Sequence, residues 1–141
     1  MNIDEITVNE TSVIAVRGRI DGATASAWEG ELLKRLLDGR KVTQGLPFLV
    51  STSRLVRGLA AEKGWIASLE KSGVEIPVDV CTYYSPRVRG LSGRIMTNAA
   101  KWAYYAPGML GVEVAFGALG ECVESGIRGE VWRDPSLWMF R

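Results

Sequence analysis

The sequence contains no histidine among its 141 residues, and this absence excludes more chemistry than any other feature. A Ser-His-Asp or Cys-His catalytic unit, a histidine general base and a zinc site with histidine ligands all need a residue that this chain lacks. Any reaction must therefore use cysteine, lysine, tyrosine, aspartate, glutamate, a bound metal or groups from a partner chain.

The sequence also has few cysteines, no large excess of either charge sign and no long apolar run. The two cysteines, Cys81 and Cys122, lie too far apart for a Cys-x-x-Cys pair, and we expect reduced thiols in a cytoplasmic protein. Lysine and arginine number 17 against 16 aspartates and glutamates, so the charge pattern of a nucleic-acid binder is missing. Residues 1–10 are polar and acidic, and no apolar run approaches the length of a membrane span. We therefore expect neither a signal peptide nor contact with a membrane or nucleic acid.

What the sequence does contain is an alternation of short apolar runs and helical periods. The apolar runs predict strands over 12–17, 46–50, 74–80, 94–97 and 112–116. Apolar residues recur at helical spacing after Ser26, after 51–53, after Asn98 and from Leu119. The expected helix breaks and ends are Asp38-Gly39, Gly64, Gly73, Pro107-Gly108 and Gly129. This order predicts a single α/β domain over 1–141, with a mostly parallel sheet of about five strands and helices on both faces.

Polar residues gather where three of the predicted strands end. Ser51, Thr52, Ser53 and Arg54 follow the second strand, Asp79 and Cys81 end the third, and Thr97, Asn98 and Lys101 follow the fourth. Parallel strands end at one edge of a sheet, so we expect these residues to lie there together. The first and third sets also open helices, whose free N–H groups suit a carboxylate or phosphate. The alternative interpretation is that they only cap helices while the charges are solvated.

Cys81 allows two interpretations. Thiolate is a soft ligand, so this residue could bind a metal or a cluster, or it could be a small buried apolar residue. One cysteine cannot hold a cluster, so the ligand interpretation requires further ligands from elsewhere. Cys122 lies on the apolar stripe of the last predicted helix, where core packing is expected.

The aromatic residues are similarly open to two interpretations. The pairs Tyr83-Tyr84 and Tyr104-Tyr105 could donate hydrogen bonds to a ligand, or pack with satisfied hydroxyl groups. The tail over 130–141 is rich in tryptophan and other large apolar residues, which suggests either a partner surface or a flap over the core.

Several segments between Pro47 and Arg133 resemble the C-terminal part of the aconitase X large subunit, a family that includes phosphomevalonate dehydratase and cis-3-hydroxyproline dehydratase. The segments are 49–54 (LVSTSR), 79–81 (DVC), 97–101 (TNAAK), 105–108 (YAPG) and 111–123 (GVEVAFGALGECV). At the corresponding places the family has V-T-T-S-R, D-T-C, T-N-S-x-K-x-x-H-Y-A-P and G-V-E-V-x-F-G-S-L-E-E-C-V. The order and approximate spacing of the segments agree.

This resemblance implies an aconitase-type α/β domain that takes part in a hydro-lyase, removing water from a small hydroxy acid at an iron or iron–sulfur centre. It makes Cys81 a candidate ligand of that centre. It places Thr97, Asn98 and Lys101 toward the substrate, together with Tyr104. It also implies partners, namely other aconitase X large-subunit segments and a small subunit. A dehydratase needs a Lewis acid for the leaving hydroxyl group and a base for the α-proton, and this chain offers at most part of that set.

Two departures from the family pattern bear on activity. Ala99 stands where the family has serine, and Tyr104 stands where it has histidine. A family large subunit is also several times longer. The favoured hypothesis is a domain or subunit completed by other chains. A non-catalytic binding or scaffolding module, which the two substitutions favour, is the alternative, and a self-sufficient enzyme ranks third because the inventory of reactive residues is thin.

Overall fold

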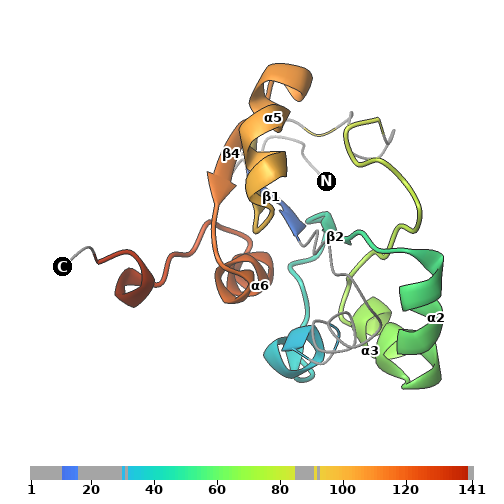
Figure 1. Ribbon diagram of the computed structural model, residues 1–141. Helices are drawn as coiled ribbons and strands as arrows, with labels where there is room; N and C mark the ends of the chain where they lie inside the picture. The colour runs from blue at the N-terminus through green and yellow to red at the C-terminus, as the bar shows by residue number, and fades with distance from the viewer. Residues whose placement is uncertain (1–10, 16–29, 31, 85–90, 92, 140–141) are drawn as a thin grey trace.

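A computed structural model describes residues 11–15, 30, 32–84, 91 and 93–139 of the chain (Figure 1). Residues 32–37 are helical and lead to the expected stop at Asp38-Gly39, whereas the capping residue Ser26 lies outside the described residues. The other elements are β1 (Thr11–Ala15), β2 (Phe48–Val50), α2 (Arg54–Glu62), α3 (Trp65–Lys71), β3 (Arg94–Thr97), α5 (Ala100–Leu110), β4 (Glu113–Phe116), α6 (Leu119–Arg128) and a 3-10 turn (Pro135–Leu137).

Four strands form one parallel sheet in the order β2-β1-β3-β4. Val13 of β1 pairs with Phe48 on one side and with Met96 on the other, so β1 is central. Parallel neighbours need crossover connections rather than tight hairpins, and the helices between the strands supply them. The predicted α/β class is therefore confirmed, although the sheet has four strands and not five.

The missing fifth strand is the segment predicted over 74–80, which runs beside β2 but forms only two isolated bridges, from Glu75 to Leu49 of β2 and from Val78 to Thr52 just beyond it. Glu75 exchanges hydrogen bonds with β2 at its start, and Pro77 accepts one from the Thr52 N–H at 3.1 Å. A continuous ladder would also need a donor at residue 77, and proline has no N–H. Pro77 thus interrupts the pairing and explains why the prediction of a strand there is wrong.

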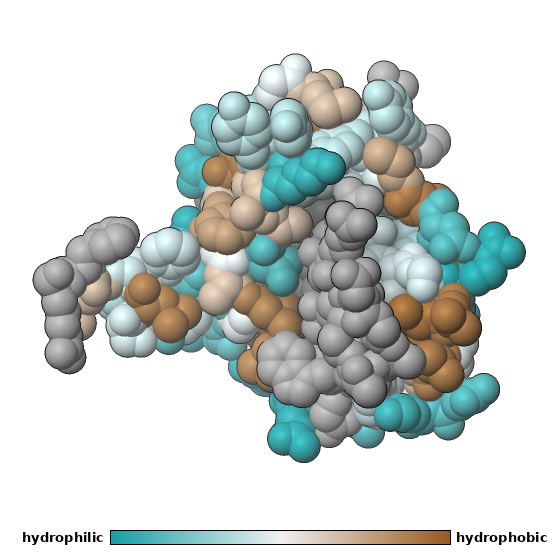
Figure 2. Space-filling view, viewed as in Figure 1, coloured by the Kyte–Doolittle hydropathy of each residue, from teal (hydrophilic) through white to brown (hydrophobic). Residues whose placement is uncertain are grey.

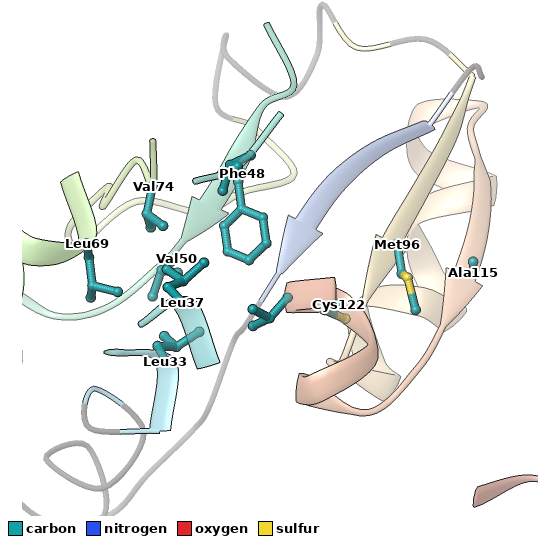
Figure 3. Close-up of a cluster of buried hydrophobic side chains, with 11 residues drawn as sticks. Leu33, Leu37, Phe48, Val50, Leu69, Val74, Met96, Ala115 and Cys122 are labelled. Carbon is teal, nitrogen blue, oxygen red and sulfur yellow. The ribbon is translucent and has the colours of Figure 1, made fainter. Parts of the chain in front are cut away.

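Side chains alternate between the two faces of the sheet, and each face has its own buried cluster. Phe48, Val50 and Met96 face one cluster, whereas Leu49 and Ile95 face the other. The first cluster is completed by Leu33, Leu37, Val42, Leu69, Val74, Ala115, Cys122 and Val123, and the second by Tyr83, Trp102, Ala106 and Val112. In Figure 3, side chains from helix 32–37, α3 and α6 meet the strands of the first cluster. Helices therefore cover both faces, as predicted, and each fully buried large side chain stabilises the fold by about 1.5–3 kcal/mol.

Glycines mark helix boundaries as predicted, whereas the proline that was expected to end a helix does not. Gly64, with a φ of +73°, separates α2 from α3, and Gly129 ends α6 as expected. The prediction for the third helix is wrong at both ends, because Ala99 rather than Asn98 precedes it and it runs through Pro107 to Leu110. Proline removes one backbone donor, but Leu110 packs against the second cluster and holds the final turn in place.

The C-terminal tail forms no strand within its described residues, and its role as a partner surface or a flap stays a prediction. It leaves α6 with Val131 packed against the first cluster, and the Asp134 N–H and the Trp138 indole donate hydrogen bonds to Glu121. It makes a short 3-10 turn and projects from the sheet and helices (Figure 1). It exposes Leu137, Trp138 and Met139, and Figure 2 shows apolar residues both there and over α2. No helix in the described ranges is long and apolar enough to cross a membrane.

Candidate functional site

The predicted site residues lie at one edge of the sheet, in two groups on either side of β1. One group follows β2 and includes Thr52, whose carbonyl accepts a hydrogen bond from the Asp79 N–H at 3.0 Å. The other follows β3, where the Thr97 carbonyl accepts one from the Gly117 N–H at 3.0 Å. Because β1 separates β2 from β3, the sheet brings the two groups to the same edge but not into direct contact.

The group after β2 is largely occupied by interactions within the chain. Ser53 caps α2, since its Oγ accepts a hydrogen bond from the Val56 N–H at 3.2 Å. The Asp79 carboxylate accepts two more from Arg54, one from Nε at 2.6 Å and one from the backbone N–H at 3.2 Å. These hydrogen bonds hold the pKa of Asp79 below its ordinary value. A carboxylate of the chain itself therefore stands where an external anion was expected, whereas Ser51 and Thr52 are half-buried and Ser53 and Arg54 are exposed.

The start of α5 is different, because its N-cap side chain makes no hydrogen bond to the first turn. Its N-cap residue is Ala99, whose methyl group cannot accept a hydrogen bond, and its first turn contains no acidic residue. Thr97 is buried and its Oγ1 accepts a hydrogen bond from the Ala99 N–H at 3.2 Å, which fixes the turn into the helix. Half-buried Asn98 lies in that turn, and exposed Lys101 adds a full positive charge. A first turn with no acidic residue and with a lysine is therefore the better candidate for an anion site at this edge.

A comparison with α6 strengthens this assignment. The helix α6 begins at the same edge, after β4, but the Glu121 carboxylate of its own first turn accepts a hydrogen bond from the Ala118 N–H at 2.8 Å. The start of α2 is likewise filled by Ser53 and Asp79. Among the helices whose starts the structure describes at this edge, α5 alone shows no carboxylate hydrogen-bonded at its start, and Lys101 stands in its first turn.

Cys81 lies in a turn that is tied to the start of α5. The turn closes with a hydrogen bond from the Tyr84 N–H to the Cys81 carbonyl at 3.1 Å. Tyr83 then stacks on Trp102 of α5, with ring centroids 5.8 Å apart, and donates its hydroxyl to the Lys101 carbonyl at 3.4 Å. The sequence left two roles open for Tyr83, hydrogen bonding to a ligand or packing with a satisfied hydroxyl group. In the structure Tyr83 has the second role.

The two thiols have opposite environments. Cys81 is exposed, which excludes its interpretation as a buried apolar residue, whereas Cys122 is completely buried, as predicted. Burial, together with the nearby Glu121 charge, raises the pKa of the Cys122 thiol to about 12, so it remains protonated. No cluster of three or more metal-binding side chains occurs in the described ranges, so Cys81 offers one ligand at most without help from another chain.

Tyr104 lies one turn beyond Lys101 on α5 and is 79% exposed. Its ring meets that of Tyr105 edge to face, with centroids 5.0 Å apart. Residues three apart on a helix share a face, so Tyr104 lies on the same side as Lys101. Thr97 and Asn98 precede α5, and Lys101 and Tyr104 lie on it; that these four residues form one ligand site stays a prediction.

These features define a class of protein: an α/β domain with a parallel sheet, whose candidate ligand site lies at the carboxyl edge of the strands. Residues 24–128 match the family described as the aconitase X third domain, and the chain belongs to the aconitase X family. The resemblance noted from the sequence is thereby confirmed.

Named relatives agree with this assignment. The chain is 35% identical over 116 residues to a cis-3-hydroxy-L-proline dehydratase of Pseudomonas aeruginosa, covering 81% of the chain and 20% of the relative. It is 36% identical over 99 residues to the enzyme of that name from Hypocrea jecorina, covering 69% of the chain and 17% of the relative. It is also 30% identical over 105 residues to the phosphomevalonate dehydratase large subunit of Methanosarcina mazei, covering 74% of the chain and 25% of the relative.

A solved structure shares the fold. The holo-form of Thermococcus kodakaraensis aconitase X superposes with a TM-score of 0.65 at 23% sequence identity, covering 82% of this chain and 28% of that one. The chain thus spans between a sixth and about a quarter of the length of these proteins.

Proposed function

We propose that this chain is a domain or subunit of an aconitase X-type hydro-lyase that removes water from a small hydroxy acid, and that it needs partner chains for activity. The names of its relatives support the reaction class, because they are dehydratases. Their greater length supports the need for partners, which we expect to be another large-subunit segment and a small subunit. We expect no nucleic-acid or membrane partner.

The observation that carries the proposal is the uncapped start of α5 beside Lys101. A substrate carboxylate at this point accepts hydrogen bonds from the first-turn N–H groups and is neutralised by the lysine. Thr97 and Asn98 set the direction of the turn, and the exposed Tyr104 hydroxyl can reach a second polar group of the acid. Ser51, Thr52, Ser53 and Arg54 belong to the same edge, but the ion pair with Asp79 makes Arg54 a secondary contributor.

Iron or an iron–sulfur cluster belongs to this proposal only in a complex. The exposed Cys81 thiol is the one residue of this chain that we assign to such a centre, and the described residues alone do not form a metal site. A bound metal centre would supply the Lewis acid for the leaving hydroxyl group. The role of this chain is then to bind and orient the carboxylate of the substrate. The free thiols support a reducing, cytoplasmic compartment.

A non-catalytic binding module is the second candidate. Ala99 removes the hydroxyl group that the family pattern has at the start of α5, and Tyr104 replaces a titratable imidazole with a phenol. The first change removes a polar group and the second keeps only a phenol hydroxyl, while Lys101 and the first-turn N–H groups of α5 remain available for an anion. This candidate therefore predicts binding of a hydroxy acid without turnover.

Anaerobic purification of this chain from its native lysate, with mass spectrometry of the co-purifying chains, tests the need for partners. The proposal predicts recovery of a chain with the missing cluster ligands, and dehydration of a hydroxy acid by the complex. A chain that purifies alone and binds the acid without turnover would favour the second candidate. Within the complex, Cys81→Ser should abolish iron incorporation while Lys71→Ala, on the exposed end of α3, should not. Unchanged iron content in Cys81→Ser would remove Cys81 from the centre.

A further inference from the structure

Two buried polar atoms beside the start of α5 have no hydrogen-bond partner: the hydroxyl oxygen of Thr82 and the indole nitrogen of Trp102. Thr82 is 5% exposed and Trp102 is 2% exposed, so neither can be solvated freely. The great majority of buried polar side-chain atoms in folded proteins are paired, because an unpaired one has lost its water without compensation. Within the described part of the chain these are the two side-chain atoms in this condition, and they lie on neighbouring segments.

Both residues adjoin the proposed carboxylate site. Trp102 is the third residue of α5 and so belongs to its first turn, while its ring is buried in the second cluster. Thr82 lies in the turn after Cys81, next to Tyr83, whose ring stacks on Trp102 at an angle of 8°. The Tyr83 hydroxyl also bonds to the Lys101 carbonyl, which fixes the turn against the start of the helix. The two unpaired atoms and the uncapped first turn therefore belong to one region.

The chemistry of these groups selects the ligand. The indole N–H is a donor only, the first-turn N–H groups and Lys101 are donors, and the Thr82 hydroxyl can donate or accept. A ligand that satisfies them must present acceptor oxygens. The apolar neighbours of Trp102, which include Leu49, Ile95 and Ala106, favour a singly charged group over a doubly charged one, since burial of charge is costly.

We propose that Trp102 and Thr82 form the buried wall of the α5 site and hydrogen-bond to the carboxylate of a small hydroxy acid, in preference to a phosphate. This inference rests on the proposed function and adds to it two binding residues and a ligand preference. The binding site then has an exposed side, formed by Lys101, and a buried side, formed by the indole N–H and the threonine hydroxyl.

Titration of the uniformly ¹⁵N-labelled chain with cis-3-hydroxy-L-proline tests the inference by the indole N–H signals in NMR spectra. The chain has five tryptophans, and the Trp102 signal is the one that disappears in Trp102→Phe. We expect this signal to shift to saturation as the acid binds, whereas the Trp138 indole, which already donates to Glu121 at 2.7 Å, should not move. Inorganic phosphate at the same concentrations should move the Trp102 signal far less.

Thr82→Val supplies a second readout that needs no tryptophan variant. Valine has the shape of threonine without the hydroxyl, so this variant should melt at a higher temperature than wild type while binding the acid about three- to tenfold more weakly. Thr82→Ser keeps the hydroxyl and should bind like wild type. A purely structural role for Thr82 would not combine greater stability with weaker binding.

The outcomes separate this inference from the proposed function. If the acid binds with Lys101-dependent affinity while the Trp102 signal stays still and Thr82→Val binds like wild type, the buried wall is wrong and the α5 site stands. A phosphate-induced shift as large as that of the acid would overturn the carboxylate preference. The absence of saturable binding would overturn the α5 site itself, and this inference with it.

Discussion

Replacing Glu121 with glutamine should detach the C-terminal tail and destabilise the domain. Glu121 is 1% exposed, and its Oε1 accepts hydrogen bonds from the Asp134 N–H at 2.8 Å and the Trp138 indole at 2.7 Å. Its Oε2 accepts one from the Ala118 N–H at 2.8 Å and lies 3.6 Å from Arg133. The groups at both oxygens are hydrogen-bond donors or a positive charge, so one carboxylate accepts hydrogen bonds both from the start of α6 and from the tail.

The magnitude of the effect follows from this geometry. A glutamine side chain has one acceptor oxygen, so its amide nitrogen must face at least one donor that the carboxylate satisfied. A hydrogen bond to a charged group contributes about 1.5–3 kcal/mol, and an unpaired buried donor costs about 1–3 kcal/mol. We therefore expect Glu121→Gln to lower the free energy of unfolding by about 2–4 kcal/mol.

The assay is urea unfolding followed by tryptophan fluorescence, with Glu124→Gln as the matched control. Glu124 lies on the same helix, but its ion pairs with Arg40 and Arg128 are on the surface, where such pairs contribute about 0–1 kcal/mol. A loss for Glu121→Gln that is no larger than the loss for Glu124→Gln would refute the reasoning, because the fully buried carboxylate would then be no more important than a half-buried one in surface ion pairs.

The same carboxylate predicts a dependence of stability on pH. Burial raises the pKa of Glu121, but the hydrogen bonds from Ala118, Trp138 and Asp134, with the Arg133 charge, outweigh burial and hold the pKa below its ordinary value. A folded-state pKa below the unfolded value of about 4.3 means that this stabilisation is present above that pH and is lost as the pH falls through the folded pKa. The difference between wild type and Glu121→Gln should therefore be full at pH 7 and shrink in acid; a constant difference across this range would contradict the assignment.

Two further predictions concern packing and thiol chemistry. A Cβ at position 126 would clash with the ring of Phe48, so Gly126→Ala should cost about 1–3 kcal/mol in urea unfolding. Gly120→Ala on the same helix meets nothing within 4 Å and should not destabilise, and equal effects would contradict the close approach of α6 to β2. Cys81 should react with a thiol reagent in the folded chain, whereas buried Cys122 should react only on unfolding; simultaneous labelling of both in native buffer would contradict their placement.

The sequence was sufficient to predict the α/β class, the parallel sheet and most element boundaries. Residues 94–97 form β3 as predicted, because the apolar pair Ile95-Met96 lies between the turn residues Gly93 and Asn98. The helix breaks at Gly64 and Gly129 were also predictable, since both positions need a positive φ. Two predictions that involve prolines were wrong. Pro77 interrupts the strand predicted over 74–80, whereas Pro107 does not end the helix that was predicted to stop there. The outcome depended on the backbone partner in the first case and on the packing of Leu110 in the second.

The position of the candidate site residues at one edge of the sheet was predictable, but their hydrogen bonds and ion pairs were not. The strand ends and helix starts placed the residues at one edge, as alternating strands and helices require. The pairing of Arg54 with Asp79 could not be foreseen, because it depends on a left-handed turn at Asp79, with a φ of +52°. The unpaired polar atoms of Thr82 and Trp102 could not be predicted either. Whether a buried polar atom finds a hydrogen-bond partner depends on contacts between segments that are distant in the sequence. Cys81 and Lys101 were identified from the sequence, and their roles as ligand and anion binder stay predictions.

Isothermal titration of a small hydroxy acid into this chain and into Lys101→Ala tests the central claim most directly, with Lys71→Ala as a control lysine at the end of α3. We expect saturable binding to wild type and to Lys71→Ala, and about five- to tenfold weaker binding to Lys101→Ala, since a partly exposed charge pair contributes about 1 kcal/mol. Equal affinity of all three proteins would contradict the account, because the anion site would then not lie at the start of α5.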